Sequence, residues 1–415
     1  MLVKRYIFDD LKTHLLKKEM CLIVGPRQAG KTTLMRQLQD HLEAKGEKTF
    51  FLSLDFERDQ PHFMSQTALI ERLRLEFGRH KGYVFIDEIQ RKENAGLFFK
   101  GIYDMQTPHK FILSGSGSVE LKEKVHESLA GRKRMFELST VSLKEFIQFK
   151  TGYRYEDRLE EYLKVNKNEA SRFLMEYLNF GGYPRVIIED TLDEKLKTID
   201  EIYRSYIEKD IAYLLRVERI DAFGELMRVL AGQIGKMVNL NELSSTLGIS
   251  VQTVKNYLYY AEKTFIIRRV TPFFSNLRKE ISKAPVVYFN DLGLRNFAVR
   301  QFGRHVMFSE TGFIFQNLVH HLLLDKTRHE SSTIHYWRTK DKAEVDFVIN
   351  RGDDVIPVEV KCRELKGTEI GRSLRGFISK YSPSEAWVVN LSLHDEETIG
   401  KTKVKFIPCL ERLSP

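Results

Sequence analysis

Residues 21–33 read Cys21-Leu22-Ile23-Val24-Gly25-Pro26-Arg27-Gln28-Ala29-Gly30-Lys31-Thr32-Thr33. An apolar run precedes a G-x-x-x-x-G-K-T motif, and residues 34–38 have the character of a helix, so the motif has the strand–loop–helix context of a phosphate-binding loop. Gly25 and Gly30 permit backbone turns that a Cβ would oppose, and the N–H groups of the loop can then surround phosphate oxygens. We predict that residues 25–33 bind ATP, that Lys31 acts on its β- and γ-phosphates, and that the Thr32 hydroxyl is a ligand of Mg²⁺.

A second motif follows at Tyr83-Val84-Phe85-Ile86-Asp87-Glu88. An apolar run that ends in two carboxylates is typical of a buried parallel strand, which carries them to the edge of the sheet where ligands bind. We expect Asp87 to hold Mg²⁺ opposite Thr32 and Glu88 to polarise the attacking water. The alternative is a strand that ends in an ordinary polar turn.

Two further stretches supply candidates for catalysis. The apolar run 110–113 leads into Ser114-Gly115-Ser116-Gly117-Ser118, where Ser114 or Ser116 could contact the γ-phosphate or the attacking water. In the basic segment 131–134, Arg132 or Arg134 could act as an arginine finger, in cis or on a neighbouring subunit of a homo-oligomer. A plain Gly/Ser turn and a solvated basic turn are the respective alternatives.

Composition limits the class of protein. The chain has 415 residues, of which 42% are hydrophobic and 30% charged, as in a globular protein with more than one domain. Its formal net charge of +9 favours acidic partners such as nucleotides and nucleic acid. No apolar run approaches the roughly 20 residues that span a bilayer, and the three cysteines form no C-x-x-C pair. We therefore expect a cytoplasmic protein without a membrane partner, a disulfide framework or a zinc site.

Residues 223–270 have the pattern of a winged helix-turn-helix. Asn239 or Asn241 can cap a first short helix, and Ser250 can cap a second, which turns four polar residues outward: Gln252, Thr253, Lys255 and Asn256. Residues 236–283 contain eight Lys/Arg and three Asp/Glu, an excess that suits the DNA backbone. We expect Lys255, Arg268 and Arg269 at a DNA-binding surface. The alternative is a packing module with a solvated basic face.

A third constellation begins after about residue 285. Asp346 lies in one predicted strand, 343–350, and Glu359-x-Lys361 in the next, 355–361. A period of two places Glu359 and Lys361 on one face. This pattern resembles the PD-(D/E)xK nucleases, which implies that Asp346 and Glu359 bind a metal ion while Lys361 positions or deprotonates water. Glu344 faces the same side and could join them.

One residue departs from the nuclease pattern. Gln316 stands where relatives carry Glu, so the site has less negative charge, and we expect Mn²⁺ to fill it better than Mg²⁺. The alternative is a binding scaffold in which Asp346 and Lys361 form a structural ion pair. We expect Trp337 in the core and the pair His320-His321 at the surface.

The order of these motifs resembles the AAA+-type ATPases of bacteria and archaea that carry a C-terminal domain of unknown function. The resemblance extends to Gly181-Gly182-Tyr183-Pro184, Glu208-x-Asp210-Ile211 and Tyr288-Phe289-x-Asp291-x-Gly293-Leu294. It implies an ASCE-type ATPase core, a helical lid, a winged-helix segment and a nuclease-like C-terminal domain. In related signal-transduction ATPases a Gly-x-Pro element lies in the lid near the nucleotide. Tyr183 and Pro184 are its candidates here, with an ordinary helix–helix turn as the alternative.

Taken as a whole, the chain is predicted to be an α/β protein with four parts. These are a P-loop NTPase (AAA+-like) parallel sheet over 1–150, a helical lid over 151–220, a winged helix over 221–284 and a restriction-endonuclease-like domain over 285–415. The expected function is ATP binding and hydrolysis with Mg²⁺, coupled to DNA binding or processing. The alternatives are a nucleotide-gated, metal-dependent nuclease and a nucleotide-dependent switch that binds proteins through an inactive nuclease-like domain.

Overall fold

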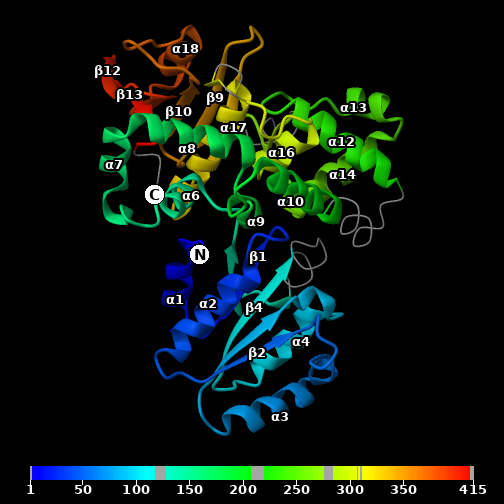
Figure 1. Cartoon of the computed structure of the whole chain (residues 1–415). Coiled ribbons are helices and arrows are strands. Elements are labelled where there is room, and N and C mark those ends of the chain that lie inside the picture. The colour runs from blue at the N-terminus through cyan, green and yellow to red at the C-terminus, as the bar shows by residue number, and fades with distance from the viewer. Residues whose placement is uncertain are drawn as a thin grey trace.

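The computed structural model of the chain describes residues 2–116, 128–206, 219–274, 284–305, 307–308 and 311–411. It has two lobes that meet at a waist (Figure 1). The lower lobe in that view contains the P-loop stretch, and the larger upper lobe contains the elements that follow residue 142. Gly117, Ser118 and the motif Glu208-x-Asp210-Ile211 lie outside the described residues.

The lower lobe is built on a five-stranded parallel sheet with the order β2-β3-β4-β1-β5. Its strands are β1 (Met20–Gly25), β2 (Thr49–Ser53), β3 (Tyr83–Asp87), β4 (Lys110–Ser116) and β5 (Lys133–Glu137). β1 and β3 are buried along their whole length, which explains why their sequences are continuous apolar runs. Because β4 lies between β1 and β3, the P-loop, the two predicted carboxylates and Ser114 meet at one edge of the sheet.

Helices cover both faces of this sheet. Alternate residues of β1 face two separate cores, one with α1 (Ile7–His14) and α2 (Lys31–Glu43), the other with α3 (Gln66–Phe77) and α4 (Ala95–Asp104). Two short 3-10 helices follow β2 and β3, η1 (Gln60–Phe63) and η2 (Ile89–Arg91). The strand order and the helix after the P-loop confirm the predicted P-loop NTPase sheet.

The upper lobe begins with helices. They are η4 (Glu156–Arg158), α6 (Leu143–Lys150), α7 (Leu159–Val165), α8 (Lys167–Phe180), α9 (Pro184–Ile187), α10 (Leu192–Arg204), α12 (Ile220–Gly232), α13 (Leu240–Leu247), α14 (Val251–Lys263), α16 (Leu292–Ala298) and α17 (Gly312–Lys326). Asn239 caps α13, Gly248 ends it with a φ of +60°, and Ser250 caps α14, as the sequence predicts. The antiparallel pair β6 (Ile267–Val270) and β7 (Val286–Phe289) follows α14.

A six-stranded mixed sheet completes the upper lobe, with the order β12-β13-β11-β10-β9-β8. Its strands are β8 (Thr333–Arg338), β9 (Glu344–Asn350), β10 (Val355–Val360), β11 (Glu385–Asn390), β12 (Asp395–Ile399) and β13 (Thr402–Pro408), and α18 (Arg372–Tyr381) lies between β10 and β11 in the chain. β8, β9 and β10 run antiparallel, whereas β10, β11 and β13 run parallel. Trp337 packs beneath α18 in a small core of its own, as expected.

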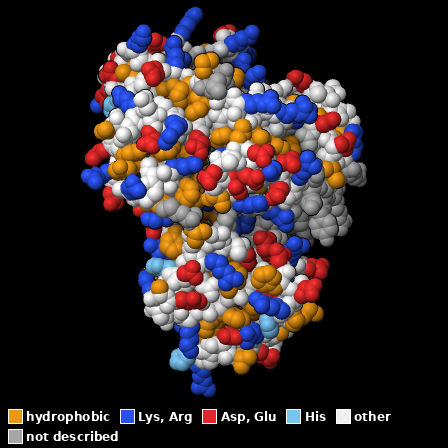
Figure 2. Space-filling model, in the orientation of Figure 1, with side chains coloured by type: hydrophobic (Ala, Val, Ile, Leu, Met, Phe, Trp, Pro, Cys, Tyr) orange, Lys and Arg blue, Asp and Glu red, His pale blue; other side chains and the backbone are white. Residues whose placement is uncertain are grey.

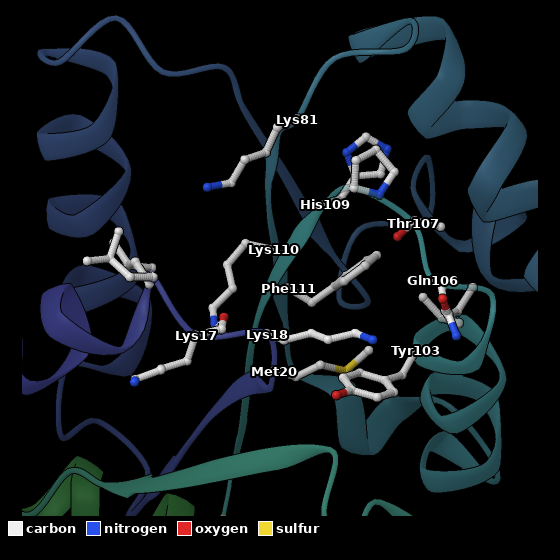
Figure 3. A pocket seen from close by; sticks show the side chains of 14 residues that line it. Lys17, Lys18, Met20, Lys81, Tyr103, Gln106, Thr107, His109, Lys110 and Phe111 are labelled. Carbon is white, nitrogen blue, oxygen red and sulfur yellow. The ribbon is translucent and has the colours of Figure 1, made fainter.

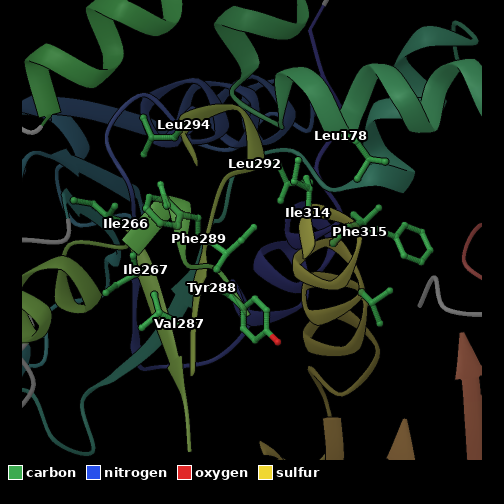
Figure 4. Packing of buried hydrophobic residues seen from close by; sticks show 14 of the residues in the cluster. Leu178, Ile266, Ile267, Val287, Tyr288, Phe289, Leu292, Leu294, Ile314 and Phe315 are labelled. Carbon is green, nitrogen blue, oxygen red and sulfur yellow. The ribbon is translucent and has the colours of Figure 1, made fainter. Parts of the chain in front are cut away.

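One hydrophobic core joins the predicted lid, the helix-turn-helix segment and the C-terminal sheet. It extends from Val141 to Cys409 and takes residues from α8, β6, β7, α16 and α17 (Figure 4). His320, on α17, is buried there and stacks on Tyr288 with ring centroids 4.9 Å apart. The expectation that His320 lies at the surface is therefore wrong, because α17 turns this face toward β7. Among the described residues, no helix is long and apolar enough to cross a membrane.

Candidate functional site

The P-loop takes its shape from two residues with positive φ. Gln28 has a φ of 58° and Gly30, which precedes α2, has a φ of 94°, a left-handed conformation that glycine adopts most easily. Gly25 is needed for a different reason, since a Cβ there would lie 2.1 Å from the backbone oxygen of Leu138. The loop therefore wraps the N-terminus of a 13-residue helix, where backbone N–H groups and the helix dipole favour an anion.

Lys31 lies inside this loop. Its side chain is buried, and its Nζ donates hydrogen bonds to the backbone oxygens of Pro26, at 2.8 Å, and Gly25, at 3.2 Å. Thr32 and Thr33 begin α2 on its exposed side, and Ala29 is buried behind the loop. The amine is thus held at the loop by neutral carbonyl groups, at the place where phosphates are expected.

Asp87 links three elements at the edge of the sheet. The Thr32 hydroxyl on α2 donates to Asp87 Oδ2 at 2.6 Å, and the Ser114 hydroxyl on β4 donates to Asp87 Oδ1. Asp87 itself is only 4% exposed at the end of β3. The structure therefore brings the three residues together as the sequence predicts.

Glu88 follows Asp87 with a φ of 57°, which turns the chain sharply at the end of β3. The Gln90 amide donates to Glu88 Oε2, and the Ser116 backbone N–H donates to Gln90 Oε1 at 3.2 Å. Burial raises the pKa of the Glu88 carboxyl, Lys31 opposes this effect, and the charge of Asp87 adds to it. Gln90 is a site residue that sequence reasoning missed, although it lies only two positions after Glu88.

The predicted lid turn lies over the P-loop. A Cβ placed on Gly30 would be 3.9 Å from Pro184 Cγ, and Arg185, the next residue, donates to Gln28 Oε1 at 3.0 Å and to Glu201 at 2.9 Å. Tyr183 is buried beside them. Arg185 is a second residue that the sequence did not single out, because nothing local shows that α9 lies against a loop 157 positions away.

Arg132 lies at the N-terminal ends of the strands, at the opposite end of the sheet from the P-loop. It directly precedes Lys133, which pairs with Met20 at the start of β1, and its guanidinium pairs with Asp104 at 2.8 and 3.2 Å. The P-loop is at the other end of β1, so Arg132 cannot reach the phosphates bound by its own chain. The suggestion that it acts in cis is therefore corrected by its position.

A basic pocket of about 250 Å³ occupies that opposite end of the sheet (Figure 3). The buried Lys110 amine donates to the backbone oxygens of Lys17, at 2.8 Å, and His14, at 3.0 Å, beyond the end of α1. Lys18 lies over the Tyr103 ring, and Lys81 donates to the Tyr83 hydroxyl. Cations at helix C-termini complement the helix dipole, so this pocket has a structural explanation separate from the P-loop.

The helix-turn-helix segment presents fewer free cations than its sequence suggests. Arg268 pairs with Glu137 of the lower lobe at 2.9 Å, and Arg269 pairs with Glu262 at the end of α14. Lys255 is exposed on α14 with Gln252 and Asn256 beside it. Each guanidinium is thus paired with a carboxylate and stays partly exposed, so contact of Arg268 and Arg269 with DNA stays a prediction.

The four polar residues of the C-terminal constellation come together. The Gln316 amide on α17 donates to Asp346 Oδ1 at 2.8 Å, and the Val360 N–H donates to Asp346 Oδ2 at 2.7 Å. Lys361 Nζ lies 2.5 Å from Glu359 Oε1, so the lysine pairs with Glu359 and not with Asp346. Burial raises the pKa of Asp346 to about 7, the Val360 N–H opposes this effect, and the charges of Glu359 and Glu344 add to it. We call these residues, Gln316, Asp346, Glu359 and Lys361, the Asp346 cluster.

Glu359 has one carboxylate oxygen without a protein partner. Oε2 is buried and makes no hydrogen bond to the described residues, while Gly371, before α18, lies so close that a Cβ there would be 2.7 Å from Oε1. Glu344 pairs with Arg338 at 3.4 Å instead of joining the cluster. In the described part of the chain, no group of three or more His, Cys, Asp or Glu side chains is arranged to hold a metal ion.

Three family models match successive parts of the chain. Residues 17–147 match the AAA domain, residues 171–305 match a domain of unknown function (DUF8612), and residues 311–411 match another (DUF4143). The first match covers the lower-lobe sheet with its P-loop. This lobe is thus similar to the AAA domain.

Relatives and solved structures extend these matches. An uncharacterized protein of Methanocaldococcus jannaschii is 26% identical over 411 residues, which is 96% of this chain and 87% of the relative. One of Mycobacterium tuberculosis is 25% identical over 89% of this chain and 75% of its own length. The Aeropyrum pernix ORC1 protein in complex with DNA has a TM-score of 0.31 at 12% identity, covering 72% of this chain and 93% of that chain. AMPPCP-bound DnaA from Aquifex aeolicus has a TM-score of 0.27 at 17% identity, covering 63% and 90%.

Proposed function

We propose that the lower lobe binds ATP and hydrolyses it with Mg²⁺ at the C-terminal edge of its sheet. The observation that carries this proposal is the meeting of Lys31 and Thr32 with Asp87, Glu88 and Ser114, which arrive there from α2, β3 and β4. A P-loop by itself binds phosphate. A P-loop beside a hydroxyl–carboxylate pair and a second, half-buried carboxylate has the groups that hydrolysis requires.

The residues around Asp87 fit a magnesium ion. The Thr32 hydroxyl and the Asp87 carboxylate are oxygen ligands of the kind Mg²⁺ prefers, and they lie within 2.6 Å of each other. Mg²⁺ held by these two oxygens would reduce the negative charge of the phosphates. Ser114 holds the other oxygen of Asp87 and so fixes the direction of the carboxylate. Lys31 can exchange its carbonyl partners for phosphate oxygens with little movement.

Glu88 is the residue we assign as general base. Burial raises its pKa, which strengthens the carboxylate as a proton acceptor. Gln90 holds one of its oxygens and is itself held by the Ser116 N–H, so the other oxygen can orient water. Arg185 and Pro184 bring the lid to the loop and are placed to respond to the nucleotide.

The test is ATP turnover in Mg²⁺ by the Glu88→Gln variant. The substitution keeps Asp87 and the P-loop, so nucleotide binding should persist while turnover falls by roughly 10²–10⁴-fold. The matched control is Glu93→Gln, which changes an exposed carboxylate shortly after η2 and should leave turnover unchanged. Equal turnover in wild type and Glu88→Gln would remove Glu88 from this role.

The position of Arg132 bears on the oligomeric state. Because it lies at the edge of the sheet away from its own P-loop, a role as an arginine finger requires a second copy of the chain. We retain that role only as part of a homo-oligomer, in which Arg132 would exchange Asp104 for the phosphates of a neighbour.

We propose DNA as the partner whose binding is coupled to ATP. The supporting observation is the helix-turn-helix of α13 and α14 followed by the paired strands β6 and β7, an order of elements that we interpret as a winged helix. Gln252, Lys255 and Asn256 are exposed on α14, and side chains of these types contact bases and phosphates in helix-turn-helix proteins. Because Arg268 and Arg269 on β6 pair with carboxylates, we expect this segment to contribute modestly to DNA affinity.

The Asp346 cluster supports a second candidate function, metal-dependent cleavage of nucleic acid. The buried, unpartnered Oε2 of Glu359 and the carboxylate of Asp346 are suitable cation ligands. Gln316 can contribute an oxygen but no charge, and Lys361 would have to leave Glu359 before it could act on water. Both features predict weak cleavage that is clearer in Mn²⁺ than in Mg²⁺.

A further inference from the structure

The two lobes have separate cores and are joined by two short segments of the chain. These are residues 138–142 and the N-terminal residues before α1, where Tyr6 bonds to Glu145 and Gln148 of α6. Below the waist, two clusters cover the faces of the sheet, and among the described residues Phe265 is the one member of these clusters that comes from the upper lobe. Above the waist, one core joins the lid, the helix-turn-helix segment and the C-terminal sheet. The chain passes from β5 to α6 through residues 138–142. Figure 2 shows the waist between the lobes.

Buried polar contacts hold the lid to the rest of the upper lobe. Asp291, which caps α16, accepts the backbone N–H groups of Gly182, at 2.8 Å, and Leu294, at 2.9 Å. The two turns leave no room for side chains, since a Cβ on Gly181 would lie 2.4 Å from the Gly293 nitrogen. The lid turn that touches the P-loop is therefore locked to the segment that follows β7.

A second set of contacts holds the end of α8. Asn296 on α16 donates to the backbone oxygens of Leu178, at 2.8 Å, and Asn179, at 3.0 Å. The Asn179 side chain in turn pairs with both backbone groups of His305 at 2.9 Å. Breaking such buried hydrogen bonds is costly, so α8 and α16 should move together.

The middle of the 138–142 segment contains two residues that make no backbone–backbone hydrogen bond to either lobe. The Leu138 N–H donates to Val24 of β1 at 2.8 Å, and the Val141 N–H donates to Gly182 of the lid at 2.8 Å. Ser139 and Thr140 between them belong to neither set of backbone hydrogen bonds. Their backbone oxygens instead accept from the Arg5 guanidinium, at 2.7 and 3.1 Å.

Arg5 links these two residues to both lobes. Its other nitrogens donate to the backbone oxygen of Ala29 behind the P-loop and to Glu145 in the first turn of α6, each at 3.0 Å. A cavity of about 530 Å³ lies beside it, between α1 and Pro26 of the lower lobe and α17 and Phe265 of the upper lobe. Its edge is crossed by two partly exposed ion pairs, Arg268–Glu137 at 2.9 Å and Arg328–Asp10 at 3.8 Å. Such partly exposed ion pairs contribute little to stability, so they do not prevent the cavity from changing its shape.

We propose that nucleotide binding moves the lid, the helix-turn-helix segment and the C-terminal sheet as one rigid body about Ser139 and Thr140, with Arg5 as the brace of the hinge. The inference rests on the proposed nucleotide site, and it states which movement of the chain nucleotide binding controls. Because the lid cannot close over the P-loop alone, closure carries α14 and the Asp346 cluster with it and changes the cavity at the waist. ATP thereby sets the position of both candidate nucleic-acid elements relative to the lower lobe.

The experiment measures distances between pairs of nitroxide spin labels by pulsed electron resonance. Labels are placed on exposed residues by Glu71→Cys on α3, Ser171→Cys on α8 and Ser379→Cys on α18, taken two at a time in a Cys362→Ser background. The native Cys21 and Cys409 are buried and should remain unlabelled. Each pair is measured without nucleotide and with a non-hydrolysable ATP analogue, and binding of the analogue is measured on the same samples.

We expect the 71–171 and 71–379 distances to shift together when the analogue binds, while the 171–379 distance stays the same. A shift of 171–379 without a shift of 71–379 would show that the lid moves alone and would overturn the inference. Analogue binding without any shift would overturn it and leave the proposed nucleotide site standing. Failure to bind the analogue would remove both.

A second variant tests the hinge itself. Arg5→Gln removes most of the bonds that brace Ser139 and Thr140, so the 71–171 distances should become more widely distributed without nucleotide. The 171–379 distances should not change, which also shows that the upper lobe is folded. An unchanged 71–171 distribution in Arg5→Gln would assign the hinge elsewhere.

Discussion

Two places in the molecule bring a lysine and two carboxylates to strand ends, and they differ in what holds the lysine. At the P-loop, Lys31 donates to the backbone oxygens of Gly25 and Pro26, and Asp87 accepts from two hydroxyls. In the Asp346 cluster, Lys361 lies against a carboxylate, and Asp346 accepts from a side-chain amide and a backbone N–H.

The difference indicates which ligand each site can take. Phosphate oxygens replace neutral carbonyls as partners of Lys31 at little cost, because a charge-assisted hydrogen bond is stronger than the one it replaces. A ligand at the Asp346 cluster must first separate Lys361 from Glu359, or bind to the one free oxygen of Glu359. The P-loop is therefore prepared for an anion, whereas the Asp346 cluster is largely satisfied by its own side chains.

The largest expected effect on this comparison comes from replacing each of the two lysines with alanine. Lys31→Ala should weaken ATP binding by about 2–5 kcal/mol, as for a truncated partner of a buried charge pair. Lys361→Ala should leave ATP binding unchanged. A titration with a fluorescent ATP analogue measures both, and an equal loss in the two variants would break the comparison.

The next effect concerns pH and stability. The pKa of Asp346 is about 7 in the folded chain, raised by burial from the ordinary value of 3.8. Between these values the folded state binds a proton that the unfolded state has released, so stability falls as pH rises from about 4 to about 7 and levels off above 7. Asp346→Asn should therefore raise the free energy of unfolding by roughly 1–3 kcal/mol at pH 8, and by much less at pH 5.

Denaturant unfolding at the two pH values measures this effect. The Asn side chain can keep both hydrogen bonds if Gln316 turns its amide over, so the substitution changes charge more than contacts. The matched control is Asp341→Asn at an exposed position nearby. A wild-type stability that is flat from pH 6 to pH 8 would show that Asp346 is already ionised and free to bind a cation.

A smaller change should move the Asp346 cluster toward a working metal site. Gln316→Glu adds a carboxylate beside Asp346, and we expect it to raise Mn²⁺ affinity about tenfold. Electron resonance of free Mn²⁺ reports the affinity, and nicking of supercoiled plasmid reports cleavage, with Asp346→Ala as the variant that should lose both. No Mn²⁺ binding and no nicking by wild type or Gln316→Glu would leave this domain as a binding scaffold.

The smallest effect is expected at α14. If Lys255 contacts a phosphate, Lys255→Ala should reduce the salt dependence of duplex binding by about one unit of slope. Arg269→Ala should change it less, because Glu262 already holds that guanidinium. Fluorescence anisotropy at several salt concentrations separates the two. A slope that both variants leave unchanged would favour a packing module.

The candidate site of the lower lobe could be predicted because its residues lie in short motifs at strand ends. Asp87 and Ser114 follow apolar runs directly. Because β3, β4 and β1 are neighbours in the sheet, these residues lie close to the P-loop. The partners of Arg268 and Asp291 could not be predicted in this way. Glu137 lies 131 positions from Arg268, and Gly182 lies 109 positions from Asp291, so charge counts and motif spacing do not reveal these contacts.

The division into four parts stays a prediction, although one hydrophobic core crosses its boundaries. The boundaries at 220 and 284 follow changes of motif, whereas the upper core takes Leu178, Ile267, Tyr288 and Phe315 from three of those parts (Figure 4). Hydrophobic periodicity shows that each helix has a buried face, and it cannot show which other element covers that face.

The shared upper core also bears on how the chain acquires its structure. A segment whose apolar face is covered only by distant sequence has no stable state until that sequence is available. The lower-lobe sheet is complete by residue 137 and can form while the rest of the chain is still being synthesised. The lid helices must wait for α16 and α17, so during synthesis a finished P-loop would stand beside an unfinished lid.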